Sequence, residues 1–294
     1  MEKVLRDRKA ILIFVGPALL LYVLVLLVPI GWSVVYTFYD GSPITGFRYV
    51  GMANFARLFR DQTFLRSFWF TTRYALLVSG GQIVMGLLLA LLYHFYLKRA
   101  SSIVRTLVFF PVVLPTVAVA QMFQKFFEIT PQYGLVNAIL AVLRLEQLVQ
   151  PWLGQGSTAF WVLVIMDIWK AMGFYAVLLY AGLIEIPEEL IEAARLDGAS
   201  GWSLVRFMIV PLLTPVLVSS LIFSLNGTLK VFDSVVALTG GGPGTTTTPL
   251  TLYMYKAAFT YNEYGYGSAV AVLLTLYSLL FTLLIYRRAR QNVA

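Results

Sequence analysis

The chain has 294 residues, of which 59% are hydrophobic and only 12% are charged, and its mean hydropathy is +0.80. Soluble domains carry about 25% charged residues, so this composition excludes an ordinary water-soluble fold and predicts an integral membrane protein. The net charge of +8 does not indicate a nucleic-acid partner, because the basic residues stand at the ends of apolar runs and not in one patch. That placement suits membrane lipid headgroups. The absence of cysteine excludes disulfides and thiolate ligands.

Six apolar runs are long enough to cross a bilayer, which takes about 20 residues in a helix. They cover residues 10–39, 74–97, 106–124, 159–183, 207–229 and 264–286. Backbone groups in lipid must be satisfied within the segment, so these runs are predicted to be helices. The sequence therefore predicts an all-α membrane protein, with residues 1–294 forming a single transmembrane domain of six helices. Prolines such as Pro115 and Pro215 predict kinks or broken ends.

The basic residues near the ends of the runs predict the orientation, since they are enriched on the cytoplasmic side. They cluster at both termini and after the second run: Lys3, Arg6, Arg8, Lys9, Lys98, Arg99, Arg105, Arg287, Arg288 and Arg290. Several arginines between the first and second runs oppose this bias. The clusters nevertheless favour cytoplasmic N- and C-termini.

An acidic segment, EIPEELIEAARLDGASGW, separates the fourth and fifth runs and holds five of the 14 acidic residues. It has the chemistry of a short helix. Pro187 suits a first helical position, and Glu188 and Glu189 favour the first turn. Gly198 is predicted to end the helix in a left-handed conformation. With six helices, the segment 185–206 would face the cytoplasm.

Two interpretations of this segment are open. It can be an ordinary solvated loop, or a surface on which another protein docks. Small residues at Ala193 and Ala194 would let a second backbone approach closely, and carboxylates would form a polar rim, as around a helix that lies in a groove. These features favour docking.

The residues EAARLDGASGWSLVRFMIVPLLTP resemble the EAA loop of binding-protein-dependent ABC importer permeases. Glu192, Ala193, Ala194, Gly198 and Pro211 match that pattern, while Met208 and Val210 replace its usual Ile and Leu with other apolar residues. Three further stretches resemble carbohydrate-uptake, maltose-permease-like members of the group: FRYVGMANFARLF, DIWKAMGFYAVLLYAGLIEIP and VFDSVVALTGGGPGTTTTPLTLYMYKAAF.

This resemblance implies a type I ABC importer permease fold in the cytoplasmic (inner) membrane of a bacterium or archaeon. It implies a second permease subunit from a different chain, two cytoplasmic ABC ATPase subunits and an extracytoplasmic solute-binding protein. The chain would bind no cofactor and catalyse nothing, because ATP and Mg are used by the partner ATPase. The residues expected to couple to that ATPase are Glu192, Ala193, Ala194, Asp197, Gly198 and Ala199.

Polar residues within or beside the predicted membrane helices mark a candidate substrate path: Asp167, Trp169, Lys170, Asn226 and Asp233. A charge at bilayer depth costs about 2.5 to 3.5 kcal/mol on insertion scales, so such residues usually face a cavity or a partner. Asp167 and Lys170 are three residues apart on one helical face and could form an ion pair that joins helices. Alternatively, they form a polar wall for a sugar, with Trp169 stacking on its ring. Both interpretations are open.

Two other function classes fit the sequence less well. A membrane-embedded enzyme would need an acidic pair, a histidine cluster or a metal site, but His94 is the only histidine. A secondary transporter would carry ion-coupling carboxylates and inverted repeats. The GGGPGTTTT stretch lacks the lysine of a phosphate-binding loop and is expected to be a flexible external turn. Residues 135–149 are expected to form an external amphipathic helix.

Overall fold

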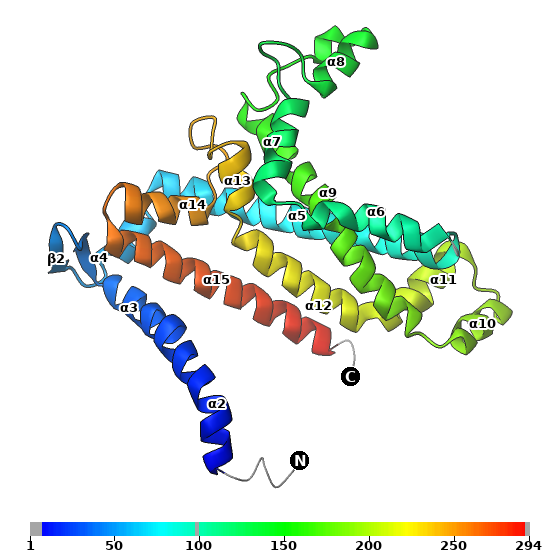
Figure 1. Cartoon of the computed structure of the whole chain (residues 1–294), viewed down its shortest axis with the longest axis horizontal. Helices are drawn as coiled ribbons and strands as arrows, with labels where there is room; N and C mark the ends of the chain where they lie inside the picture. Colours follow the sequence, from blue (N-terminus) through cyan, green and yellow to red (C-terminus); the bar gives the residue numbers. More distant parts are fainter. Residues whose placement is uncertain (1–7, 98–99, 292–294) are drawn as a thin grey trace. The chain divides into compact units, whose positions relative to one another are not determined.

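The computed structural model describes residues 8–97 and 100–291 as helices with one two-stranded hairpin (Figure 1). They divide into two compact units, Met1–Gln62 with Tyr253–Thr275, and Thr63–Leu252 with Leu276–Ala294. Lys3, Arg6, Lys98 and Arg99, on which part of the orientation argument rests, lie outside the described residues.

The first unit begins with a long apolar helix. It comprises α2 (Arg8–Tyr22), a π-helical turn η1 (Val23–Leu27) and α3 (Val28–Tyr36). A hairpin follows, with β1 (Tyr39–Ser42) antiparallel to β2 (Gly46–Tyr49), and then α4 (Ala53–Leu58). The first predicted membrane helix therefore ends at Tyr36 and not at Tyr39, because the chain turns into the hairpin there.

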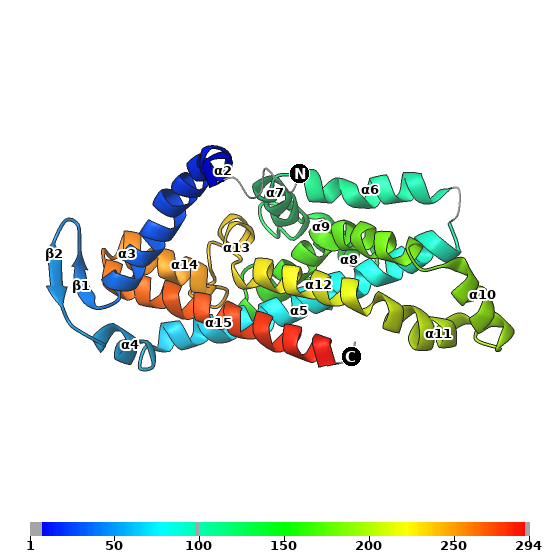
Figure 2. The same cartoon turned by 90° about the horizontal axis from the view of Figure 1, so that it is seen from below.

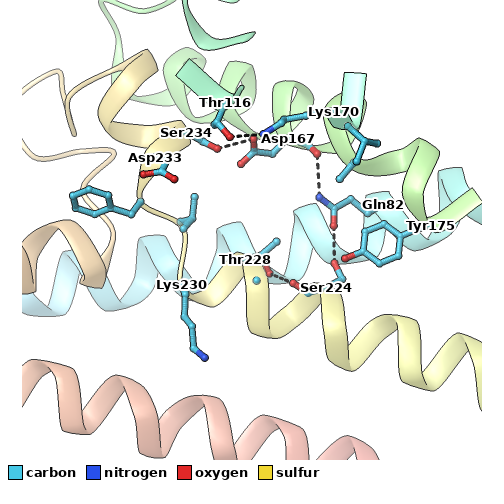
Figure 3. Close-up of a pocket in the computed structure, with 15 residues that line it drawn as sticks. Gln82, Thr116, Asp167, Lys170, Tyr175, Ser224, Thr228, Lys230, Asp233 and Ser234 are labelled. Atoms are coloured by element: carbon cyan, nitrogen blue, oxygen red, sulfur yellow. Dashed lines mark hydrogen bonds between the residues drawn. The ribbon is translucent and has the colours of Figure 1, made fainter. Parts of the chain in front are cut away.

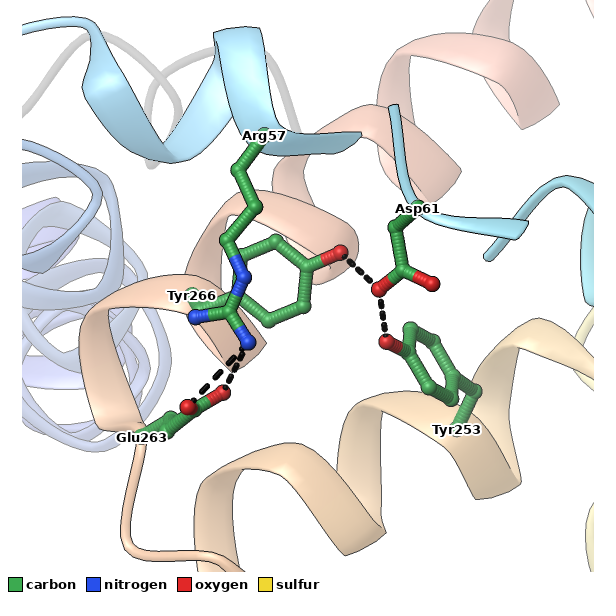
Figure 4. A network of polar contacts seen from close by, with 5 residues as sticks. All are labelled: Arg57, Asp61, Tyr253, Glu263 and Tyr266. Carbon is green, nitrogen blue, oxygen red and sulfur yellow. Dashed lines mark hydrogen bonds and ion pairs between the residues drawn. The ribbon is translucent and has the colours of Figure 1, made fainter. Parts of the chain in front are cut away.

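The chain returns to the first unit through the end of α14 (Leu250–Tyr255), a π-helical turn η5 (Lys256–Thr260) and the start of α15 (Tyr264–Gln291). A polar network ties these elements to the segment after α4 (Figure 4). Asp61 accepts hydrogen bonds from the hydroxyls of Tyr253 and of Tyr266, the latter at 2.6 Å. Burial, and then the bond to Asp61, raise the pKa of the Tyr253 phenol, so it remains a donor.

The second unit contains most of the helices (Figure 2). They are α5 (Gln62–Phe95), α6 (Ser101–Val113), α7 (Thr116–Phe126), α8 (Leu135–Val142), η3 (Glu146–Leu148), α9 (Gly156–Ile184), α10 (Glu188–Leu196), α11 (Gly201–Leu204), η4 (Val205–Ile209), α12 (Val210–Leu229), α13 (Asp233–Leu238), the start of α14 and the second half of α15. The helical segment predicted over 135–149 is thus divided into α8 and the short η3.

Five helices of the described chain are long and apolar enough to cross a membrane, or six segments if one bent pair is a single crossing. The five are Leu12–Tyr36, Gln62–Phe95, Gly156–Ile184, Gly201–Leu229 and Tyr264–Arg288. The prediction of an all-α membrane fold is therefore confirmed at this level. The second helix starts well before residue 74, because Phe64, Ser67, Phe70 and Thr71 continue its buried face at helical spacing.

The third apolar run, 106–124, is not one continuous helix. It is divided between α6 and α7, which meet at an angle of 97°. Leu114 at the break is extended, with ψ 139°. The ring of Pro115 disfavours helical geometry in the preceding residue, which explains the break.

Clusters of buried side chains hold the second unit together, and two of them are extensive. The first joins α5, α7, α9 and α13 through residues such as Tyr74, Phe123, Leu163 and Val235. The second lies at the other end of α9, where Leu179 and Leu183 pack with the α10–α11 segment. At Gly173 on α9, an added Cβ would stand 2.2 Å from the carbonyl oxygen of Val108, so α6 approaches α9 as closely as backbones allow.

Candidate functional site

A polar cavity of about 350 Å³ lies within the second unit, among helices that are otherwise apolar (Figure 3). Its polar lining residues come from α5, α7, α9, α12 and α13 and the residues beside them: Gln82, Thr116, Asp167, Lys170, Tyr175, Ser224, Thr228, Lys230, Asp233 and Ser234. Ligand sites usually measure about 300 to 1,000 Å³ and combine an apolar wall with a few placed polar groups. The cavity has both properties.

Asp167 is fixed by helices on both of its sides. Ser234 of α13 donates a hydrogen bond of 2.8 Å to Oδ1, and the hydroxyl of Tyr74 on α5 donates to Oδ2. Among the described residues, no ion pair joins Asp167 to Lys170, so the pairing considered from the sequence is not formed. The Lys170 ammonium instead donates to Thr116 of α7. Three-residue spacing places both side chains on one side of α9, but the neighbouring helices offer each of them a different partner.

Gln82 connects three helices across the cavity wall. Its Nε2 donates to the backbone carbonyl of Asp167 at 3.0 Å, and its Oε1 accepts from Ser224 of α12 at 2.6 Å. Three residues earlier on α5, the hydroxyl of Ser79 lies 2.9 Å from that of Thr228 on α12. The sequence prediction missed Gln82 and Ser224. The available signal was a single amide in the otherwise apolar run GGQIVMG, where a buried amide needs partners.

The structure brings some of the predicted path residues together and not others. Asp167, Lys170 and Asp233 all line the cavity. Trp169 packs on Phe123, with ring centroids 5.7 Å apart, as part of the core. Asn226 lies apart from the cavity, since it donates to Thr282 and accepts a 2.7 Å hydrogen bond from Ser278 on α15.

The predicted coupling segment forms a short helix, α10, followed by α11 (Figure 2). Gly198 has φ +88°, which confirms the left-handed end of the helix predicted at this residue. Glu192, Ala193, Asp197 and Gly198 are exposed. Leu196 on the same helix is 89% exposed, an unusual position for a leucine.

The other face of α10 packs against the protein. Ile191 is buried, and Ala194 and Ala199 are half-buried against the same cluster of side chains. Of the two alanines expected to admit a second backbone, Ala193 is thus exposed and Ala194 contacts the core.

The GGGPGTTTT stretch is a turn, as expected, and side-chain hydrogen bonds join its two ends. Thr247 and Thr248 are buried and donate to the carbonyls of Gly242 and Gly241, at 2.6 and 3.0 Å. Positive φ at Gly240, Gly241 and Gly244 explains the glycines. Among the described residues, no group of three or more His, Asp or Glu side chains could hold a metal ion.

Residues 82–293 match the family described as binding-protein-dependent transport system inner membrane component. The chain is 33% identical to the probable ABC transporter permease protein YurN of Bacillus subtilis, over 92% of this chain and 93% of the relative. It is 35% identical to the trehalose/maltose transport system permease protein MalF of Thermococcus litoralis, over 82% of this chain and 80% of the relative.

The fold also matches a solved structure, the crystal structure of a bacterial ABC transporter involved in the import of the acidic polysaccharide alginate. The TM-score is 0.84 at 24% identity, covering 98% of this chain and 99% of that chain. The chain therefore belongs to the family of binding-protein-dependent transport system inner membrane components, and it is a membrane permease subunit of an ABC transporter and not an enzyme.

Proposed function

We propose that the chain is the transmembrane permease subunit of an ATP-driven sugar importer and forms half of its translocation path. The observation that carries this proposal is the polar cavity lined by α5, α7, α9, α12 and α13. A path for a hydroxyl-rich solute needs hydrogen-bonding groups at bilayer depth, where polar side chains are otherwise costly. Asp167, Lys170, Gln82 and Ser224 supply both donors and acceptors, and Tyr175 adds an aromatic face.

The proposed topology has six membrane crossings, with the bent α6–α7 pair counted as one. Residues 1–294 then act as a single permease domain, and both termini are cytoplasmic. The basic residues that follow α15's apolar stretch, Arg287 and Arg288, support this orientation. In this topology residues 185–206 face the cytoplasm.

The proposed partner at α10 is a cytoplasmic ABC ATPase. Glu192, Ala193 and Leu196 offer it a small, partly apolar surface with an acidic rim, and Asp197 and Gly198 form the turn beside it. ATP and Mg are used by that partner. A second permease subunit, a second ATPase and an extracytoplasmic solute-binding protein complete the proposed assembly.

The proposal that the solute is a sugar rests on the descriptions of similar permeases. Similar permeases are described as serving the transport of trehalose/maltose, of sulfoquinovosyl glycerol and of lactose. The cavity's mixture of hydroxyl, amide and charged groups is consistent with such solutes. No observation favours the enzyme or secondary-transporter alternatives.

The proposal is tested by reconstituting the purified transporter in proteoliposomes with its binding protein and measuring uptake from a panel of radiolabelled sugars. The double variant Glu192→Arg, Ala193→Trp should abolish ATP-dependent uptake or release the ATPase, because it reverses a charge and fills the close contact. Glu146→Arg reverses a charge on η3, away from α10, and should leave uptake unchanged. Normal uptake and normal ATPase binding in the double variant would refute the coupling role of α10.

A further inference from the structure

A groove of about 690 Å³ lies where the end of α5 meets the α10–α11 segment, within the second unit. Its floor is aliphatic and aromatic: Leu88, Leu91, Leu92, Phe95, Leu204 and Val205. Pockets that bind small molecules usually measure about 300 to 1,000 Å³, so the groove is large enough for such a ligand. The polar cavity described above shares none of its lining residues.

The floor of the groove belongs to a helix that is apolar and long enough to cross the membrane, Gln62–Phe95. Leu88 and Leu92 remain 53% and 38% exposed there. At the rim, Tyr96 and Trp202 are 78% and 70% exposed. Aromatic side chains of this kind are enriched at the level of lipid headgroups, with apolar side chains on the hydrocarbon side of them. The groove therefore runs from hydrocarbon depth to the membrane surface.

Among the lining residues that the structure describes, Arg195 carries the one charged side chain and there is no carboxylate. Among the described residues, no ion pair is recorded for its guanidinium. Arg195 is exposed at the edge of the groove, where a headgroup can reach its guanidinium. A guanidinium binds a phosphate group in a two-pronged arrangement. The absence of a lining carboxylate leaves the ammonium of a zwitterionic headgroup without a partner.

We propose that this groove binds one anionic phospholipid, with an acyl chain along α5 and the phosphate on Arg195. The positive charge of Arg195 complements an anionic headgroup. The floor lies at membrane depth, which a lipid can reach and a soluble protein cannot. Gly198 and Ala199 line the groove, but Glu192 and Ala193 do not, so a lipid here leaves the surface formed by Glu192 and Ala193 free for a protein partner.

The test uses the purified transporter complex in nanodiscs of phosphatidylcholine and reads the fluorescence of Trp202, isolated by subtracting the signal of the Trp202→Phe variant. Dibrominated lipids quench tryptophan on contact. We expect dibrominated phosphatidylglycerol to quench this signal at a mole fraction about fivefold lower than dibrominated phosphatidylcholine, the ratio for one arginine near an anionic headgroup.

Arg195→Gln should remove the preference for phosphatidylglycerol, and Arg195→Lys should retain part of it. Arg206→Gln is the matched control, because the Arg206 guanidinium stands over Phe207 and does not line the groove. Equal quenching by the two lipids in the wild-type complex overturns the proposal without relying on any Arg195 variant. A preference for phosphatidylglycerol that is unchanged in Arg195→Gln also overturns the proposal. If neither lipid quenches the Trp202 signal, protein covers the groove, and this result also overturns the proposal.

Discussion

Ser234 on α13 donates a 2.8 Å hydrogen bond to Oδ1 of Asp167 on α9. With the hydroxyl of Tyr74 on Oδ2, this bond makes one carboxylate the junction of α5, α9 and α13. The same carboxylate lines the polar cavity, so a group that determines packing also belongs to the proposed substrate path.

Asp167→Ala should destabilise the protein, because it leaves two buried hydroxyls without an acceptor. Each orphaned group costs about 1–3 kcal/mol. We expect a lower unfolding temperature of the purified complex, measured by intrinsic fluorescence, together with reduced uptake. Tyr74→Phe removes one donor only and should have a smaller effect. The double variant should be less destabilised than the sum of the two single changes, since both act on one contact. Additive changes in unfolding temperature would contradict the role of Asp167 as the shared acceptor.

Lys170→Gln should weaken transport without unfolding the protein. The variant keeps a group that can donate to Thr116 but removes the charge from the cavity wall. We expect the KM for sugar uptake to rise about tenfold, because a lost hydrogen bond to a charged group costs about 1.5 kcal/mol or more. Lys125→Gln is the control, since Lys125 is an exposed residue paired with Glu128 at 2.9 Å. Equal KM values for Lys170→Gln and wild type would remove Lys170 from the proposed path.

Gly173→Ala should destabilise the packing of α6 on α9. The added methyl would stand 2.2 Å from the Val108 carbonyl oxygen, and backbone cannot move aside as a side chain can. Overpacking of this kind costs about 1–3 kcal/mol. The expected result is a lower yield of folded protein in detergent, measured by size-exclusion chromatography. Gly80→Ala on α5 meets no atom within 4 Å and should behave as wild type. An unchanged Gly173→Ala profile would show that α6 can withdraw from α9.

Asp61→Leu should loosen the first unit, because the hydroxyls of Tyr253 and Tyr266 lose their shared acceptor. Tyr266→Phe removes one donor and should cost about 1 kcal/mol. Limited proteolysis of the hairpin between β1 and β2 measures the change, since Asn54 holds that hairpin through the Thr37 and Tyr39 carbonyls. Tyr261→Phe, at an exposed tyrosine, is the control. Equal cleavage rates for Asp61→Leu and Tyr261→Phe would contradict a stabilising role.

Much of the helical architecture could be predicted from the sequence, because long apolar runs have few alternatives in a membrane protein. Residues 159–183 and 264–286 fall within α9 and α15. The break between α6 and α7 was harder to predict. Pro111 lies inside a continuous helix while Pro115 ends one, so the presence of proline alone did not give the location of the bend.

The candidate site could be predicted only in part. A charged residue in an apolar run stands out, and Asp167 and Lys170 do line the cavity. Their partners could not be predicted, because Tyr74, Thr116 and Ser234 come from helices far away in the sequence. Asn226 illustrates the converse, since a polar residue in a membrane helix can serve contacts between helices: its partners are Ser278 and Thr282.

The central claim, that α10 docks on an ATPase, is tested most directly by site-specific cross-linking. The chain has no cysteine, so Leu196→Cys introduces a single thiol on the exposed face of α10. A benzophenone maleimide on that thiol, illuminated in the purified complex, should join the permease to an ATPase subunit, identified by mass spectrometry. The same label at Val142→Cys, an 83% exposed position on α8, should give no such product. No ATPase product from Leu196→Cys in an intact complex, or equal products from both positions, would contradict the proposed coupling.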